Sequence, residues 1–123
     1  MKSWLRNAFL IVATLLCTSN AGKFYRIVWV TAYTSRQCET DKTPYITASN
    51  KRVRDGVVAC NFLRFGTKIQ FPDLFGKKIF VVEDRMARRK KNHVDIWFKR
   101  LKDARRFGKK RAVIKIITNE DKL

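Results

Sequence analysis

The sequence predicts a mainly β domain that closes into a small β-barrel. Six or seven short segments are rich in β-branched and aromatic residues, and turn residues separate them. One segment near the C-terminus has helical spacing, and no repeat or low-complexity run is present. Closure into a barrel pairs the edges that so many β-branched strands would otherwise expose.

The expected elements follow one another between residues 24 and 118. The first strand is residues 24–33 (FYRIVWVTAY), and later strands are expected at 57–60, 67–71, 78–83, 93–98 and 112–118. Residues 45–48 form a short extended piece, and residues 72–76 are expected to be a loop. Residues 93–98 alternate cleanly, which puts His93, Asp95 and Trp97 on one face. Residues 99–107 predict one short helix, which Gly108 ends before the last strand.

Residues 1–21 have the pattern of a secretory signal. Lys2 and Arg6 precede an apolar core of ten residues, 8–17, and residues 19–21 (SNA) supply the small residues of a cleavage site. A membrane span needs about 20 apolar residues, so a cleaved signal is predicted. The alternatives are an uncleaved anchor, a buried helix and lipidation of Cys17. Export to the periplasm, the cell wall or the medium follows, with membrane contact only through the signal segment.

The rest of the chain is one strongly basic domain, expected at residues 24–118 with a polar tail at 119–123. The chain has 28 Lys and Arg against 10 Asp and Glu, a net charge of +18. Such a charge favours anionic surroundings: nucleic acid, acidic lipid headgroups or an anionic wall polymer. Export favours the last two, and the lack of an RNA-binding signature argues against nucleic acid.

The cysteines leave two possibilities open, and no metal site is predicted. After signal cleavage Cys38 and Cys60 remain, and in an oxidising compartment they could form one disulfide. Two unpaired thiols are the alternative. A single His and the absence of a CxxC motif make a zinc site improbable, so no metal or other cofactor is expected.

Asp84 and Asp95 are the candidate catalytic residues. Seven of the ten acidic residues lie where acids are common, in turns, a helix surface, a polar loop and the tail: Asp55, Asp73, Asp103, Glu39, Asp41, Glu120 and Asp121. The remaining three, Glu83, Asp84 and Asp95, lie in apolar β-patterned segments. If these strands converge, two carboxylates share a cleft and the pKa of one rises, which gives a general acid. Glycosidic cleavage needs such an acid. The alternative is that each carboxylate pairs with an arginine on the barrel rim.

Six motifs carry a resemblance to a known family. They are VTAYT at 30–34, ITASN at 46–50, VVACN at 57–61, FGTKI at 65–69, VVEDRM at 81–86 and HVDIWF at 93–98. In order and spacing they resemble the 3D (three-aspartate) domain, a double-psi β-barrel related to the membrane-bound lytic transglycosylase A family. The resemblance implies six strands and cleavage of the bond between N-acetylmuramic acid and N-acetylglucosamine, with a 1,6-anhydro product. It implies that Asp95 is the general acid/base, which Asp84 supports.

The sequence departs from the family pattern at three places. Asn61 stands where the first aspartate of the family usually stands, Arg85 to Ala87 replace glycines, and Asn50 takes a position that is often glycine. Asn61 can still hydrogen-bond a sugar. The basic loop 85–91 is expected either to bind stem-peptide carboxylates or wall phosphates, or to be a solvated charged loop.

Six residues are the candidate substrate-binding residues: Asn61, Thr31, Tyr33, Thr47, Trp97 and Arg85. Trp97 could stack on a sugar ring or pack in the core, and strand packing explains the threonines and Tyr33 equally well. The sequence therefore predicts an exported, monomeric lytic transglycosylase acting on peptidoglycan glycan strands. The alternative is a non-catalytic barrel that binds glycan or an anionic wall polymer.

Overall fold

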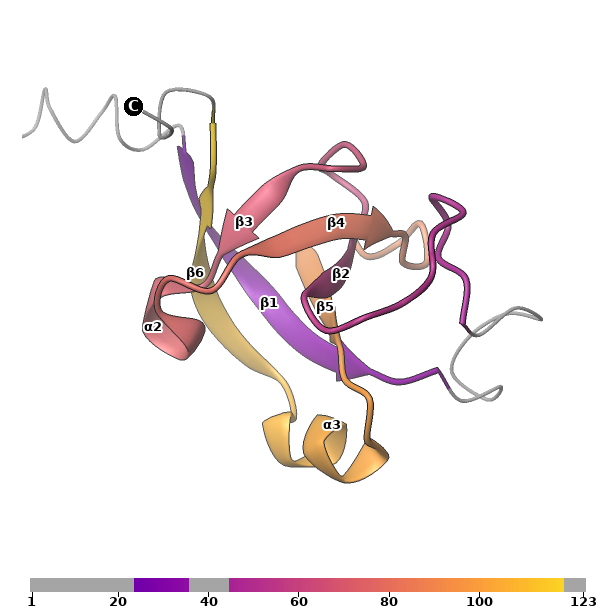
Figure 1. The fold of residues 1–123 in the computed structure, drawn as a ribbon. Helices are drawn as coiled ribbons and strands as arrows, with labels where there is room; N and C mark the ends of the chain where they lie inside the picture. Colours follow the sequence, from indigo (N-terminus) through magenta and orange to yellow (C-terminus); the bar gives the residue numbers. More distant parts are fainter. Residues whose placement is uncertain (1–23, 36–44, 119–123) are drawn as a thin grey trace, which may run out of the picture.

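The computed structural model describes residues 24–35 and 45–118, which form a closed barrel of six strands with two short helices (Figure 1). The elements, in chain order, are β1 (Tyr25–Tyr33), β2 (Val57–Cys60), β3 (Lys68–Gln70), α2 (Pro72–Phe75), β4 (Phe80–Asp84), β5 (His93–Trp97), α3 (Leu101–Phe107) and β6 (Lys110–Ile116). The predicted mainly β fold and barrel closure are confirmed. The predictions for the signal segment, Cys17, Cys38 and the polar tail lie outside the described residues.

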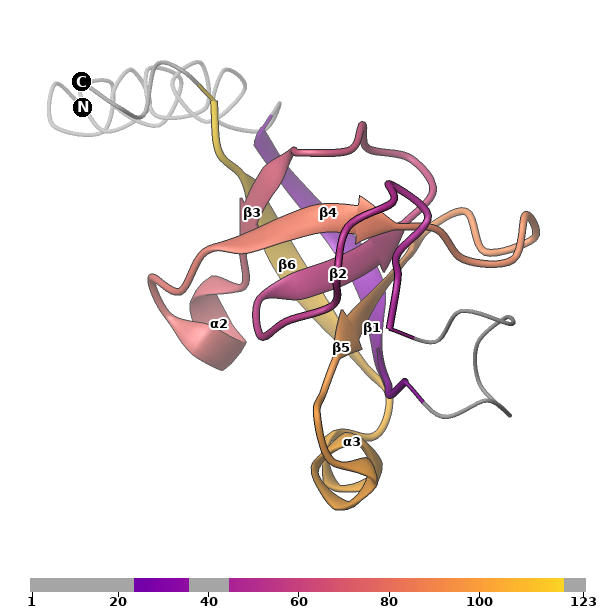
Figure 2. The ribbon, with the colours of Figure 1, turned by 45° about the vertical axis from the view of Figure 1, so that its right-hand side comes forward.

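The strand order around the barrel differs from the order along the chain. It runs β1-β5-β2-β4-β3-β6, and β6 closes the barrel against β1. β1 pairs with β5 in parallel, β2 pairs with β4 in parallel, and the other pairs are antiparallel. Figure 2 shows β5 passing between β1 and β2, which are consecutive strands in the sequence. The insertion of β5 brings the two motifs that hold Asp84 and Asp95 to either side of β2.

Alternating apolar residues fill the barrel interior. Val28 and Val30 of β1 are fully buried, whereas Trp29 and Thr31 between them are partly exposed on the other face. The same alternation puts Val94 and Ile96 of β5 into the core and leaves Asp95 on the outer face. Each fully buried aliphatic or aromatic side chain contributes about 1.5–3 kcal/mol through removal of its apolar surface from water.

Helix α2 is a correction to the sequence prediction, which expected a loop at residues 72–76. Pro72 occupies the first turn, where its missing N–H costs nothing, and Gly76 ends the helix with a φ of 59°. Phe75 then packs against Phe71 and Phe80, with ring centroids 6.0 and 5.2 Å away. Aromatic packing therefore stabilises this turn, and four residues show too little periodicity to reveal it.

Helix α3 confirms the predicted C-terminal helix, although it begins at Leu101, two residues later than expected. Its Ala104 is buried, and Phe107 stacks on Phe75 with centroids 6.1 Å apart. Gly108 has a φ of 69°, and its N–H donates to the carbonyl oxygen of Ala104 at 3.2 Å, which ends the helix. None of the described helices is long and apolar enough to cross a membrane.

Candidate active site

The strand register places four residues in one row across the outer face of the barrel. Thr31 of β1 is opposite Asp95 of β5, Asp95 is opposite Ala59 of β2, and Ala59 is opposite Asp84 of β4. Directly opposed residues share a face of the sheet. Two strand spacings separate the aspartates, so their Cα atoms lie about 10 Å apart. The small Ala59 methyl group is what stands between them.

A β-bulge in β4 puts Asp84 in this row. Val58 is opposite Val82, but Ala59 is opposite Asp84, so Glu83 is the extra residue. Without the bulge Asp84 would continue the inward series of Phe80 and Val82. Glu83 is buried at 3% exposure, and its Oε2 accepts a hydrogen bond of 2.6 Å from the Ser49 hydroxyl. The bulge therefore separates the two adjacent acids and turns Asp84 toward the face that carries Asp95.

Three uncharged donors hold the Asp84 carboxylate. Its Oδ1 accepts the backbone N–H groups of Ala48 and Arg85, each at 2.9 Å, and its Oδ2 accepts the Tyr33 hydroxyl at 3.1 Å. The Arg85 guanidinium instead donates to the Cys60 carbonyl and stacks 3.8 Å above the Phe65 ring. The Arg85 side chain thus turns away from Asp84, and backbone amides and a phenol fix this carboxylate.

Asp95 lies between two core residues of β5, and Thr31 orients it. The Thr31 hydroxyl donates to Asp95 Oδ1 at 2.9 Å. Burial raises the pKa of Tyr33 well above its usual value, and the negative charges of Asp84 and Asp95 raise it further. The phenol therefore stays protonated and remains a hydrogen-bond donor. Tyr33 thus interacts electrostatically with the carboxylates at both ends of the row.

Asn61 contacts the basic loop 85–91. Its amide nitrogen donates to the carbonyls of Ala87 and Lys90 at 2.9 and 3.2 Å, and its Oδ1 accepts the N–H of Met86 at 2.9 Å. Both amide hydrogens are thus engaged by the chain itself. Asn61 fixes the path of the loop that joins β4 to β5, and a sugar would have to share its carbonyl oxygen or displace these bonds.

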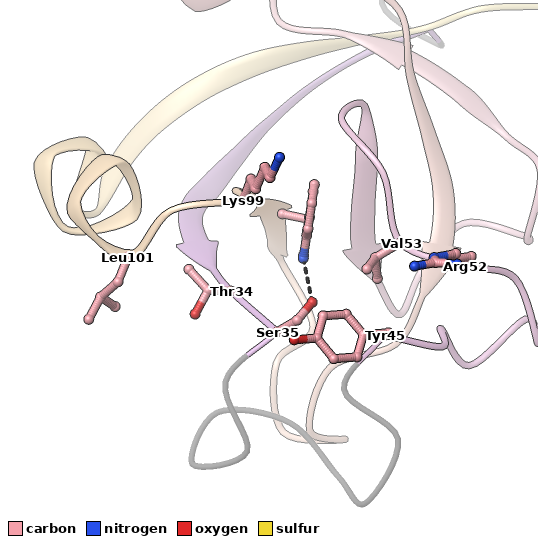
Figure 3. Close-up of a pocket in the computed structure, with 8 residues that line it drawn as sticks. Thr34, Ser35, Tyr45, Arg52, Val53, Lys99 and Leu101 are labelled. Carbon is pink, nitrogen blue, oxygen red and sulfur yellow. Dashed lines mark hydrogen bonds between the residues drawn. The ribbon is translucent and has the colours of Figure 1, made fainter.

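Trp97 and Thr47 were both predicted to bind substrate, and the structure places them in different surroundings. Thr47 is only 4% exposed, and its Oγ1 accepts the N–H of Lys51 at 3.2 Å, so it stabilises the turn over Asp84. Trp97 follows Asp95 by two residues on the same face, and its Nε1 donates to the Ser35 hydroxyl at 2.8 Å. Trp97 lines a pocket of about 380 Å³ (Figure 3).

The structure thus brings together Thr31, Tyr33, Asp84 and Asp95, with Trp97 beside them in the pocket wall. The other residues of that wall were not predicted from the sequence: Thr34, Ser35, Tyr45, Arg52, Val53, Lys99 and Leu101. They come from three separate segments, and none of them stands at a spacing that marks a site. Only the position of Trp97 on the face of Asp95 pointed toward this place.

The described part of the chain holds no group of three or more His, Cys, Asp or Glu side chains that could bind a metal ion. Cys60 is unpaired among the described residues and fully buried, and burial raises the pKa of its thiol.

No protein-family model matches the chain, and no curated protein matches it either. Fold and site together define a small β-barrel with two carboxylates and a phenol on one face.

Proposed function

We propose that the protein is an exported lytic transglycosylase of the 3D-domain type, which cleaves the bond between N-acetylmuramic acid and N-acetylglucosamine in peptidoglycan. The observation that carries the proposal is the row that brings Asp95 and Asp84 to one face, together with the Tyr33 hydroxyl that donates to Asp84. All three residues lie within motifs that carry the family resemblance. The strongly basic chain suits an anionic cell wall.

Asp95 would act as the single acid and base of the reaction. Its carboxylic acid gives a proton to the leaving glycosidic oxygen as the bond to the anomeric carbon breaks. The resulting carboxylate then takes the proton of the sugar's own 6-hydroxyl, whose oxygen closes on the anomeric carbon. No water is consumed, so no second carboxylate has to activate one. This chemistry fits a site in which the two aspartates lie two strands apart.

The other residues of the row position Asp95 and the sugar. The Thr31 hydroxyl donates to Oδ1 of Asp95 and so orients the carboxylate on the outer face. Asp84 fixes Tyr33, whose uncharged phenol lies near both carboxylates. The turn 47–50 packs over Asp84 through the N–H of Ala48 and keeps this arrangement rigid. Asp84 is therefore a positioning residue in this proposal.

A non-catalytic barrel that binds glycan or an anionic wall polymer is the second candidate. The loop 85–91 supports it, because its exposed Arg88, Arg89 and Lys91 form a cationic surface beside the row. Binding of this kind would weaken as salt screens the charges. It would not depend on a proton carried by Asp95.

Digestion of purified sacculi tests the proposal. The exported protein should release anhydro-muropeptides, and Asp95→Asn should abolish the release. Asp103→Asn is the matched control, because Asp103 is exposed on α3 and its loss removes the same charge. Equal release by the wild type and Asp95→Asn would reject the catalytic role. Sacculus binding that survives Asp95→Asn and fades with salt, with no release by the wild type, would favour the second candidate.

A further inference from the structure

The pocket that Trp97 lines is formed where β1 and β5 end. It holds about 380 Å³, which is within the size range of small-molecule sites, about 300–1,000 Å³. Thr34 and Ser35 follow β1, Lys99 follows β5, and Tyr45, Arg52 and Val53 come from the segment before β2. Figure 3 shows the labelled lining side chains, with Lys99 and Arg52 on different sides of the pocket.

Two aromatic side chains, Trp97 and Tyr45, are among the residues that line this pocket. The Ser35 hydroxyl accepts the indole N–H of Trp97 at 2.8 Å, which fixes the orientation of the ring. Tyr45 is 61% exposed, and the N–H of Val53 donates to its backbone carbonyl at 2.9 Å, which fixes the backbone of Tyr45 at the pocket. An oriented indole and an exposed phenol in one pocket present surface against which the apolar face of a pyranose ring can pack.

Two cations complete the pocket. Arg52 and Lys99 are both exposed and contribute to the lining, which contains no acidic side chain among the described residues. A guanidinium and an ammonium on different walls favour a ligand that carries a carboxylate. A neutral sugar would use the aromatic wall and leave the cations to water. The combination therefore selects a sugar with a negatively charged substituent.

We propose that this pocket is a subsite for a carboxylate-bearing amino sugar, with the ring against Trp97 and the carboxylate between Arg52 and Lys99. The inference rests on the proposed function and deepens it. Trp97 follows Asp95 by two residues on one face of β5, a distance of about 7 Å along the strand. A ring held at Trp97 therefore directs its neighbouring glycosidic bond along the strand toward Asp95.

Titration of the full chain with two matched sugars tests the subsite. N-Acetylmuramic acid and N-acetylglucosamine differ by a lactyl ether that carries the carboxylate. The wild type should bind the acid at least about fivefold more tightly, the gain expected from exposed charge pairing. The double variant Arg52→Gln/Lys99→Gln should bind both sugars alike. The matched control Arg64→Gln/Lys77→Gln removes two exposed cations outside the pocket lining and should keep the preference.

Variants of Trp97 test the aromatic wall. Trp97→Ala should weaken both sugars about tenfold, since it removes the packing surface. Trp97→Phe keeps a ring and should retain most of the affinity, which separates a lost contact from a misfolded barrel. Equal affinity of the wild type for the two sugars would overturn the subsite. So would loss of the preference in the control double variant, because the effect would then come from net charge.

The subsite and the catalytic proposal fail in different ways. If Asp95→Asn binds N-acetylmuramic acid as the wild type does, the binding belongs to the pocket and does not need the acid. Cleavage of sacculi without any preference for the acidic sugar would reject the subsite and leave the function standing. A clear preference without cleavage by the wild type would reject the function and leave the subsite standing.

Discussion

The two ends of the row across the outer face are built differently, although each carries an aspartate. At the Asp84 end the turn 47–50 covers the carboxylate, and two backbone amides and a phenol donate to it. At the Asp95 end the Thr31 hydroxyl orients the carboxylate, and the pocket of Trp97 begins two residues further along β5. Backbone amides fix Asp84, which therefore stabilises the site. Asp95 lies two residues from the pocket of Trp97 and is therefore the better candidate to contact a ligand.

The largest expected effect separates the two aspartates by activity. Asp95→Asn should lower the rate of glycan cleavage by about 10²–10⁴-fold, the usual contribution of a general acid. Its stability should change little, because the side-chain carbonyl of Asn can still accept the Thr31 hydroxyl. Initial rates of anhydro-muropeptide release and a thermal melt measure both quantities. A melting temperature of Asp95→Asn far below that of the wild type would contradict the claim that Asp95, unlike Asp84, contributes little to stability.

Asp84→Ala should lower the stability of the barrel more than Asp95→Asn does. It removes the acceptor for the N–H groups of Ala48 and Arg85 and for the Tyr33 hydroxyl. Leaving such donors unsatisfied costs about 1–3 kcal/mol, so the free energy of unfolding in urea should fall by that amount. Tyr33→Phe removes one donor and should cost less. The bracing role would be refuted by an Asp84→Ala protein that unfolds at the same urea concentration as the wild type.

Asn61→Asp tests how Asn61 holds loop 85–91. Asn61 stands where the 3D-domain pattern, which the sequence resembles, has its first aspartate. An aspartate cannot donate to the carbonyls of Ala87 and Lys90, and its charge would face both oxygens. The substitution should therefore loosen loop 85–91 and speed trypsin cleavage after its arginines and lysines. Asn61→Ser, which keeps one donor, should have a smaller effect. Unchanged trypsin resistance in Asn61→Asp would show that these bonds do not hold the loop.

The smallest expected effect is the pH dependence due to His93. Burial, with the charges of Lys90 and Lys109, lowers the pKa of His93 below its usual 6.5. The unfolded chain therefore binds this proton more readily, and its contribution to stability is lost as the pH falls below about 6.5. His93→Gln should flatten the wild-type decline in unfolding free energy between about pH 6.5 and 5. Identical slopes for the two proteins would exclude this role.

The local sequence pattern predicted the strands and α3, whereas the arrangement of the candidate site depends on non-local strand pairing. β-branched runs and the three-residue spacing of Leu101, Ala104 and Phe107 depend on neighbouring residues, so the strands and α3 were predictable. The bulge at Glu83 depends on how β2 pairs with β4, and no spacing announces it. Asp84 and Asp95 were chosen as candidates because acids are rare in apolar strands of so basic a chain.

Other parts of the site could not be predicted because they depend on tertiary contacts. Asn61 and Arg85 were expected to bind substrate, yet their side chains contact backbone carbonyls of the chain. Arg52 shares a pocket with Trp97 because β5 lies between β1 and β2 in the barrel. The chain has 28 Lys and Arg residues, and only the fold determines that Arg52 and Lys99 are the ones that line this pocket.

The most direct test of the central claim is the chemistry of the cleaved end. Sacculi digested by the wild-type protein in water enriched in heavy oxygen can be analysed by mass spectrometry. A lytic transglycosylase with Asp95 as acid and base gives muropeptides that are lighter than hydrolysis products by one water and carry no heavy oxygen. Reducing ends that contain heavy oxygen would contradict the account, because a water and not the sugar's 6-hydroxyl would then have attacked.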